Sequence, residues 1–286
     1  MWVIFALLSA LFAGITTILS KIGVKNVGSD TATAIRTVVV LIFSWIIVFL
    51  FGGEKDIPNL SAKTVLFLVL SGLATGGSWL CYFKALKIGD VNKVVPIDKS
   101  STILTMIIAF IFLHEKITVL KVICMVLIAL GTYMMIENKK EQSSASFKSN
   151  YLVWAVLSAI FAALTSILGK IGVSGINSSL GTAIRTIVVL IPAWCTAIVR
   201  EGSGNIKTAS KKDFSFLVLS GITTGLSWLC YYKALRDGQA SIVAPIDKLS
   251  ILVTIAFSRI VLKERLTKKS ASGLVLLTAG TLLLLI

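Results

Sequence analysis

The chain has 286 residues, of which 56% are hydrophobic and only 14% are charged, whereas soluble domains average about 25% charged residues. This composition predicts an integral membrane protein. The net charge of +15 is spread between apolar segments, where Lys and Arg meet lipid headgroups and set topology, so we expect no nucleic-acid partner.

Ten apolar segments follow one another along the chain, each of about 16–21 residues. That length is close to the roughly 20 residues that cross a bilayer as a helix. The segments lack the alternation of β-barrel strands, so we predict an all-α membrane protein with ten transmembrane helices. The predicted spans are 2–20, 31–51, 64–83, 94–113 and 119–136, then 151–169, 180–199, 214–232, 243–262 and 271–286.

The second half of the chain repeats the first. With an offset of 149 residues, about 60 of 137 aligned pairs are identical, and no gap is needed. "SGLATGGSWLCYFKALKIGD" aligns with "SGITTGLSWLCYYKALRDGQ", for example. We therefore predict one five-helix repeat at 1–137, a polar linker at 138–149 and a second repeat at 150–286.

An odd number of crossings inverts the second repeat relative to the first. The first repeat ends on the membrane face opposite to its start, and the linker begins the second repeat from there. Two inverted five-helix repeats are the architecture of many secondary transporters, whose substrate site lies between the repeats near the midplane.

Charged residues recur at equivalent positions of the two repeats. "VVPIDKSS" (94–101) returns as "VAPIDKLS" (243–250). Because the helix ends alternate between faces, we expect each set to gather at one face, and the two sets at opposite faces. The candidate pathway or gate residues are Arg36, Lys84, Asp98 and Lys99 in the first repeat, and Arg185, Lys233, Asp247 and Lys248 in the second.

Two interpretations of these charges stay open. A charge inside a membrane span is costly and usually pairs or lines a wet cavity. Asp98 could pair with Arg36, Lys84 or Lys99 to form an ionic gate, and Asp247 could do the same at the other face. Alternatively, the basic residues are interfacial anchors that reach toward the headgroups.

Other repeated residues have both a structural and a functional interpretation. Small residues four apart, Gly72 and Gly76, favour close helix approach. "HEKIT" (114–118) and "KERLT" (263–267) are typical of a short polar turn with a capping Thr. Four aromatic residues are typical of an interfacial belt or could wall a substrate cavity: Trp79, Tyr82, Trp228 and Tyr231.

These motifs resemble the drug/metabolite transporter superfamily in its EamA-type, two-repeat form. "FLHEKIT" and "VLKERLT" resemble the signature that closes the fourth helix of each EamA unit, and "APIDKLS" resembles the bacterial/archaeal transporter branch. The resemblance implies a carrier of small metabolites. The related small multidrug resistance proteins use a first-helix Glu, but the matching residues here are Phe12 and Ala13. A drug-cation/proton antiport of that kind is therefore not expected.

We expect a multi-pass protein of a prokaryotic plasma (inner) membrane, acting as a secondary transporter of a small polar metabolite by alternating access. The cationic residues favour an organic anion or a zwitterion such as an amino acid. No protease, hydrolase or metal-site motif occurs, and the four cysteines lie in apolar segments without CxxC spacing. We thus expect no enzyme, metal or cofactor.

The other expectations concern assembly and topology. The alternative function is a non-transporting membrane scaffold, or a subunit that needs a partner. Because the fused repeats supply both halves, a monomer could suffice, and a homodimer stays open. The count of basic residues favours the N-terminus outside, whereas ten-helix relatives imply the reverse.

Overall fold

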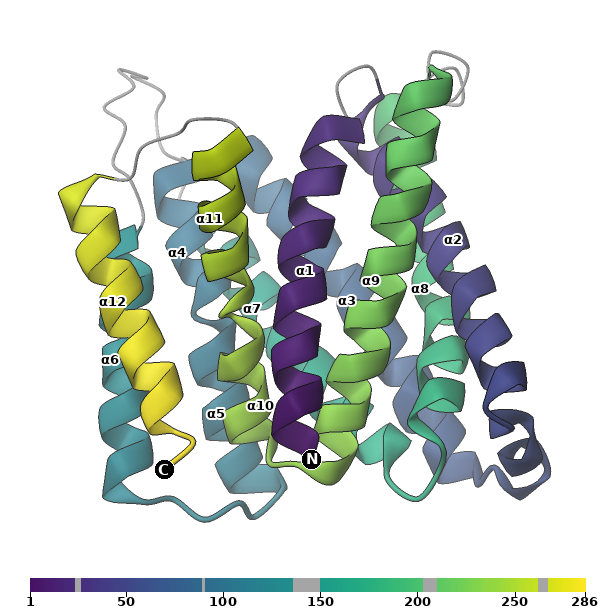
Figure 1. The fold of residues 1–286 in the computed structure, drawn as a ribbon, viewed down its shortest axis with the longest axis horizontal. Coiled ribbons are helices and arrows are strands. Elements are labelled where there is room, and N and C mark those ends of the chain that lie inside the picture. The colour runs from purple at the N-terminus through teal and green to yellow at the C-terminus, as the bar shows by residue number, and fades with distance from the viewer. Residues whose placement is uncertain (24–26, 89–90, 136–149, 203–209, 262–266) are drawn as a thin grey trace.

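The computed structural model describes the chain except residues 24–26, 89–90, 136–149, 203–209 and 262–266 (Figure 1). The predicted linker at 138–149 lies outside the described residues. The regular elements of the described part are all helices: α1 (Trp2–Gly23), α2 (Ser29–Leu50), η1 (Gly53–Asn59), α3 (Ala62–Ile88), α4 (Val91–Lys99), α5 (Ser101–Phe112), α6 (Val119–Met135), α7 (Asn150–Val173), α8 (Ser178–Glu201), α9 (Lys211–Asp237), α10 (Ala240–Asp247), α11 (Ser250–Val261) and α12 (Lys268–Leu283).

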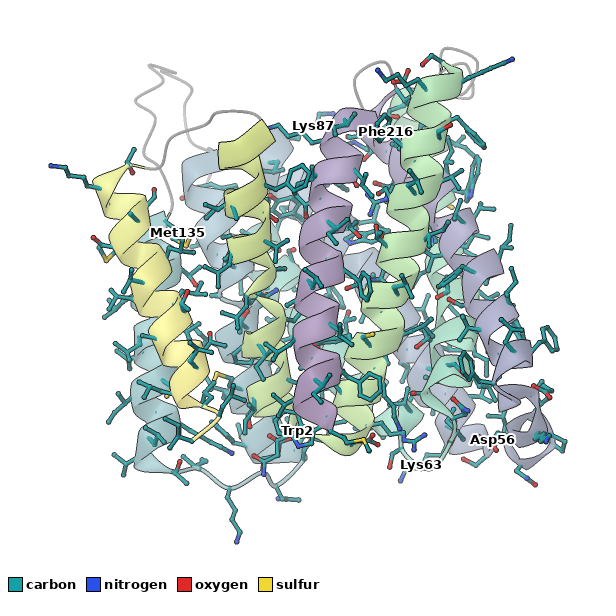
Figure 2. The ribbon with its side chains drawn as sticks, viewed as in Figure 1. Trp2, Asp56, Lys63, Lys87, Met135 and Phe216 are labelled. Carbon is teal, nitrogen blue, oxygen red and sulfur yellow. The ribbon has the colours of Figure 1, made fainter. Side chains whose placement is uncertain are left out.

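The described helices are long and apolar enough for a membrane protein. Seven stretches qualify as candidate membrane spans: Trp2–Gly23, Ser29–Leu50, Ala62–Ile88, Tyr151–Val173, Ser178–Glu201, Lys211–Asp237 and Ala240–Phe257. Helix α6 is also apolar but shorter. The prediction of an all-α, multi-pass membrane protein is thus confirmed. Charged side chains such as Lys63 and Lys87, at the two ends of α3, lie at opposite ends of the bundle (Figure 2).

Equivalent helices of the two repeats run antiparallel. Helix α2 packs on its repeat equivalent α8, and α6 packs on α12. Ala34, near the start of α2, clusters with Ala193 and Ala197 of α8, whereas Val48, near the end of α2, clusters with Leu180. Helix α1 packs on α9, and α3 packs on α7. Both termini lie at the same end of the bundle (Figure 1).

The fourth predicted span of each repeat is two helices rather than one. Span 94–113 is divided at Ser100 into α4 and α5, and span 243–262 is divided after Asp247 into α10 and α11. At both breaks the chain forms tight turns, with Ser100 donating to the Ile97 carbonyl and Lys248 to the Pro245 carbonyl.

The repeated glycines bring helices of opposite repeats into contact. A Cβ at Gly72 of α3 would lie 2.7 Å from Val188 Cβ of α8, and a Cβ at Gly76 would lie 2.5 Å from Pro192. The equivalent Gly221 of α9 has Val39 of α2 at 2.6 Å. The prediction that these glycines allow close helix approach is confirmed.

Gly72→Ala is expected to lower the free energy of unfolding by about 1–3 kcal/mol, because the added methyl overpacks the α3–α8 contact. Gly77→Ala is the matched control, since its Cβ would meet the Phe161 ring at an ordinary 3.4 Å. Both changes add the same helix propensity. Thermal unfolding of the purified variants in detergent measures the difference, and equal melting temperatures would contradict the prediction.

Candidate functional site

The Pro-Ile-Asp-Lys sequences of the two repeats, at 96–99 and 245–248, approach each other. Helix α10 packs on α5, so the broken helices of opposite repeats are neighbours. The Lys99 ammonium group lies within Coulombic range of Lys248, Asp98 and Asp247, and Lys248 exerts the largest of these influences. The Lys99 side chain is exposed at the surface of the chain.

Each aspartate accepts a hydrogen bond from the first helix of the opposite repeat. Ser158 of α7 donates to Asp98 Oδ1 at 2.8 Å, and Ser9 of α1 donates to Asp247 Oδ1 at 2.8 Å. In the described part of the chain, no ion pair within 4.0 Å joins Asp98 to Arg36, Lys84 or Lys99, and the ionic gate stays a prediction. A carboxylate that accepts a hydrogen bond from a hydroxyl still compensates part of the positive charge of nearby cations by Coulombic attraction.

The two arginines also cross between the repeats. Arg36 NH2 donates to Thr224 Oγ1 at 2.9 Å, and Thr224 is the central residue of α9. Arg185 donates from Nε to Ser71 Oγ at 3.0 Å and from NH2 to Thr75 Oγ1, and Thr75 is the central residue of α3. Arg185 is only 2% exposed.

These contacts correct the predicted position of the charges. Arg36 lies seven residues into α2, about 10 Å along its axis at about 1.5 Å per residue. Arg36 and Arg185 therefore lie deeper than the predicted faces, and we call them, together with the two Asp–Lys pairs, the central set. Their sum is four cations and two anions, or +2, contributed equally by the two repeats. Apolar periodicity misplaced them because the broken helices begin before Val94 and Val243.

The remaining two lysines lie apart from this central set. The exposed Lys84 places Nζ 4.4 Å from the centroid of the Trp154 ring. The half-buried Lys233 forms an ion pair with Asp237 at 2.9 Å. These contacts fit the alternative interpretation as anchors near the ends of helices α3 and α9.

The aromatic residues of the second repeat surround Arg185. Its Cζ lies 5.0 Å from the centroid of the Trp228 ring and 4.9 Å from that of Tyr232. The Tyr231 hydroxyl contacts Ser166 Oγ at 2.9 Å. In the first repeat, Trp79 packs against the cluster of Ala34, Ala193 and Ala197. Tyr82 packs against the cluster that contains Val94 and lies within Coulombic range of Asp98.

Sequence reasoning missed the hydroxyl residues that hold this arrangement together. Ser78 and Ser158 contact each other at 3.3 Å, and their repeat equivalents Ser227 and Ser9 do the same. The sequence did contain a signal. A Ser or Thr that recurs at the equivalent position of two apolar helices carries a hydroxyl group that needs a hydrogen-bond partner in each helix. Such side chains commonly hydrogen-bond between membrane helices.

Glu115 of the "HEKIT" motif connects the repeats at the end of the bundle that holds the termini. Its carboxylate accepts from the backbone N–H groups of Ala240 and Ser241 at 2.7 and 3.0 Å, and it therefore caps the start of α10. Lys170 Nζ lies 3.8 Å from the same carboxylate. The equivalent Glu264 lies outside the described residues.

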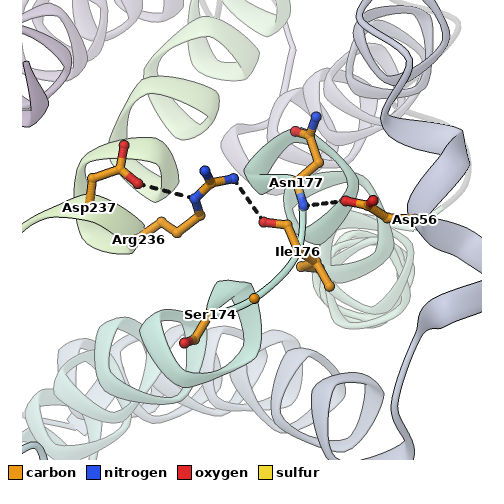
Figure 3. Close-up of a pocket in the computed structure, with 7 residues that line it drawn as sticks. Asp56, Ser174, Ile176, Asn177, Arg236 and Asp237 are labelled. Carbon is orange, nitrogen blue, oxygen red and sulfur yellow. Dashed lines mark hydrogen bonds and ion pairs between the residues drawn. The ribbon is translucent and has the colours of Figure 1, made fainter.

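A pocket of about 520 Å³ opens at the α7–α8 turn, beside the end of α9 (Figure 3). Arg236 donates to Asp237 at 3.1 Å and to the Ile176 carbonyl at 2.9 Å, and Asp56 accepts from the Asn177 N–H at 2.7 Å. These charged groups already have protein partners. The residues that line the pocket include none of the eight candidate pathway or gate residues, and the central set is the better candidate.

Similar proteins agree with this architecture. A protein named "Uncharacterized transporter in cobO 3'region", from Sinorhizobium sp, is 44% identical over 134 residues, which are 47% of this chain and 95% of that protein. An uncharacterized transporter of Archaeoglobus fulgidus is 23% identical over 269 residues, which are 92% of this chain and 90% of that protein. A crystal structure of a protein matches with a TM-score of 0.78 over 99% of this chain and 96% of that protein's chain. The sequences are 13% identical, so this match shows a shared fold.

The family assignment rests on both halves of the chain. The model of the EamA-like transporter family matches residues 1–137 and again residues 149–286. The match occurs twice and together covers nearly the whole chain. The chain therefore belongs to the EamA-like transporter family, as a membrane transporter built from two EamA units.

Proposed function

We propose that this protein is a secondary transporter that moves a small organic anion, or a zwitterion such as an amino acid, by alternating access between two inverted five-helix repeats. On this proposal the chain crosses the membrane ten times, counting each pair of broken helices as one crossing. The antiparallel packing of α2 on α8 and of α6 on α12 supports this topology. Broken helices beside a central site are a recurrent feature of such carriers.

The observation that carries the proposal is the charge at the centre of the bundle. Four cations and two anions give a sum of +2, and within the part of the chain that the structure describes none of the six forms an ion pair within 4.0 Å. Uncompensated charge inside a membrane protein is costly. A bound anion would compensate it, whereas a cation would add to the repulsion.

Unequal burial of repeat-related residues supports alternating access. Five residues of the first repeat are more accessible than the equivalent residues of the second repeat. The pairs are Arg36 and Arg185, Lys99 and Lys248, Phe83 and Tyr232, Leu86 and Leu235, and Ile97 and Ile246. The difference fits a conformation that is open toward the α3–α4 side and closed toward the α9–α10 side.

The closed side has a set of polar contacts between the repeats, which we call the Glu115 network: Glu115, Lys121, Lys170, Gln239 and the first turn of α10. Lys121 Nζ donates to Gln239 Oε1 at 2.6 Å. Lys170 Nζ donates to the Leu235 carbonyl at 3.0 Å and also to the Gly238 carbonyl. These contacts hold the α9–α10 connection against α7 and the end of α5.

The test is uptake into liposomes that contain the purified protein. Radiolabelled organic anions, amino acids and organic cations would be offered one at a time, with protein-free liposomes as the control. We expect saturable uptake of at least one anion or amino acid and no uptake of the cations. Uptake of organic cations alone would overturn the substrate class, and uptake of no compound, with no ligand stabilising the monomer, would favour the scaffold alternative.

A further inference from the structure

The two repeat-related arginines both retain a buried N–H group without an acceptor. In Arg185 this is the NH1 group, and in Arg36 it is the Nε group. Only one other buried side-chain polar atom in the described part of the chain, Glu54 Oε2, lacks a partner. The recurrence at equivalent positions indicates a property of both repeats.

The surroundings of Arg185 leave one direction for a ligand. Ser71 and Thr75 occupy its Nε and NH2 groups, and the rings of Trp228 and Tyr232 lie at 5.0 and 4.9 Å from its Cζ. The NH1 group is therefore the unoccupied edge of the guanidinium. A buried charged donor without an acceptor is costly, and guanidinium edges match the oxygens of carboxylate and phosphate groups.

Arg36 offers the same chemistry in the more accessible half. Its NH2 group is held by Thr224 while its Nε group has no acceptor, and its side chain is only half-buried. An anion that enters from the accessible side would meet Arg36 before Arg185.

We propose that Arg36 and Arg185 form two repeat-related oxyanion sites that bind the carboxylate or phosphate group of the carried metabolite, one in each half of the pathway. This inference deepens the proposed function and rests on it for the identity of the ligand as a transported substrate. Arg36 receives the anion when its half is open, and Arg185 receives it when the opposite half opens.

A purely structural role for the arginines makes a different prediction. As braces between repeats, they would stabilise the protein equally with or without an anion. As oxyanion ligands, they make stability depend on the charge of an added compound, because a ligand that binds the folded state raises its stability. The dependence on ligand charge therefore separates the two roles.

The experiment measures binding to the full-length protein in detergent, by thermal shift and by titration calorimetry. The probes are inorganic phosphate, succinate and its neutral diamide succinamide. We expect phosphate or succinate to raise the melting temperature and succinamide to leave it unchanged. Phosphate alone would assign a phosphorylated metabolite, and succinate alone a carboxylate. Stabilisation by neither anion would overturn the proposal.

Four variants assign the site. Arg36→Gln and Arg185→Gln are expected to weaken anion binding by about tenfold to a hundredfold, the range for a charged hydrogen bond. Arg185→Lys keeps the charge but loses the planar fork, and covers the case in which Arg185→Gln does not fold. Arg236→Gln removes an arginine outside the central set and is expected to leave binding unchanged.

The outcomes for binding and transport are separable. Unchanged anion affinity in Arg36→Gln and in Arg185→Lys would overturn this inference even if liposomes take up anions. Arginine-dependent binding without uptake of any anion would uphold the two sites and contradict the proposed transport. Arginine-dependent binding together with uptake would support both.

Discussion

Replacing both Asp98 and Asp247 with asparagine is expected to lower anion uptake by roughly a hundredfold while the protein stays folded. Each carboxylate accepts a serine hydrogen bond at 2.8 Å, and the asparagine carbonyl oxygen can accept the same bond. The change therefore isolates the charge. The sum over the central set rises from +2 to +4, and a unit charge at about 4 Å contributes about 4 kcal/mol at an effective dielectric constant of about 20.

The direction of the effect differs between binding and transport. With the aspartates neutral, anion affinity is expected to stay the same or to increase, because opposing charge has been removed. Uptake falls because a more tightly held anion leaves slowly, and because Lys99 loses the two carboxylate charges that act on it. Asp237→Asn is a control at the surface. Normal uptake and normal pH dependence in the double variant would show that the aspartates have no part in the pathway.

Glu115→Gln is expected to shift the conformational equilibrium toward opening on the α9–α10 side. The change removes the negative charge that caps Ala240 and Ser241 and that lies 3.8 Å from Lys170. Hydrogen bonds to charged groups contribute about 1.5–3 kcal/mol. The population of the alternative conformation should therefore rise by about tenfold or more, and uptake should fall because the closed state on this side is no longer favoured.

Labelling of a single cysteine measures this shift. Ala244 of α10 is 6% exposed, so Ala244→Cys, in a background that lacks the four native cysteines, is expected to react slowly with a water-soluble maleimide. Glu115→Gln should accelerate the reaction about tenfold, and Asp237→Asn at the same end of the bundle should not. Equal reaction rates in all three proteins would contradict a latching role for the Glu115 network.

The sequence was sufficient to predict the features that depend on local composition and on repetition. Apolar length predicts the membrane helices, and the 149-residue offset predicts two equivalent halves. Close helix approach at Gly72 and Gly221 also follows from residue size. These predictions succeed because each depends on residues near one another in the chain or on the direct comparison of two copies.

The contacts of the charged residues could not be predicted in this way. Arg36 and Thr224 are 188 residues apart, and Asp98 and Ser158 are 60 apart. The predicted fourth span of the second repeat begins at 243, where the apolar run starts. The observed α10 begins at Ala240, where Glu115 from the other repeat caps it. The carboxylate that defines this helix start is thus distant in the sequence.

The serine–aspartate contacts make the two halves of the chain depend on each other. Asp98 takes its hydroxyl donor from α7, and Asp247 takes its donor from α1. Neither half can complete its own aspartate contact. Each half therefore relies on the other for the hydroxyl donor of its aspartate, so a change at either serine acts on the aspartate of the opposite half.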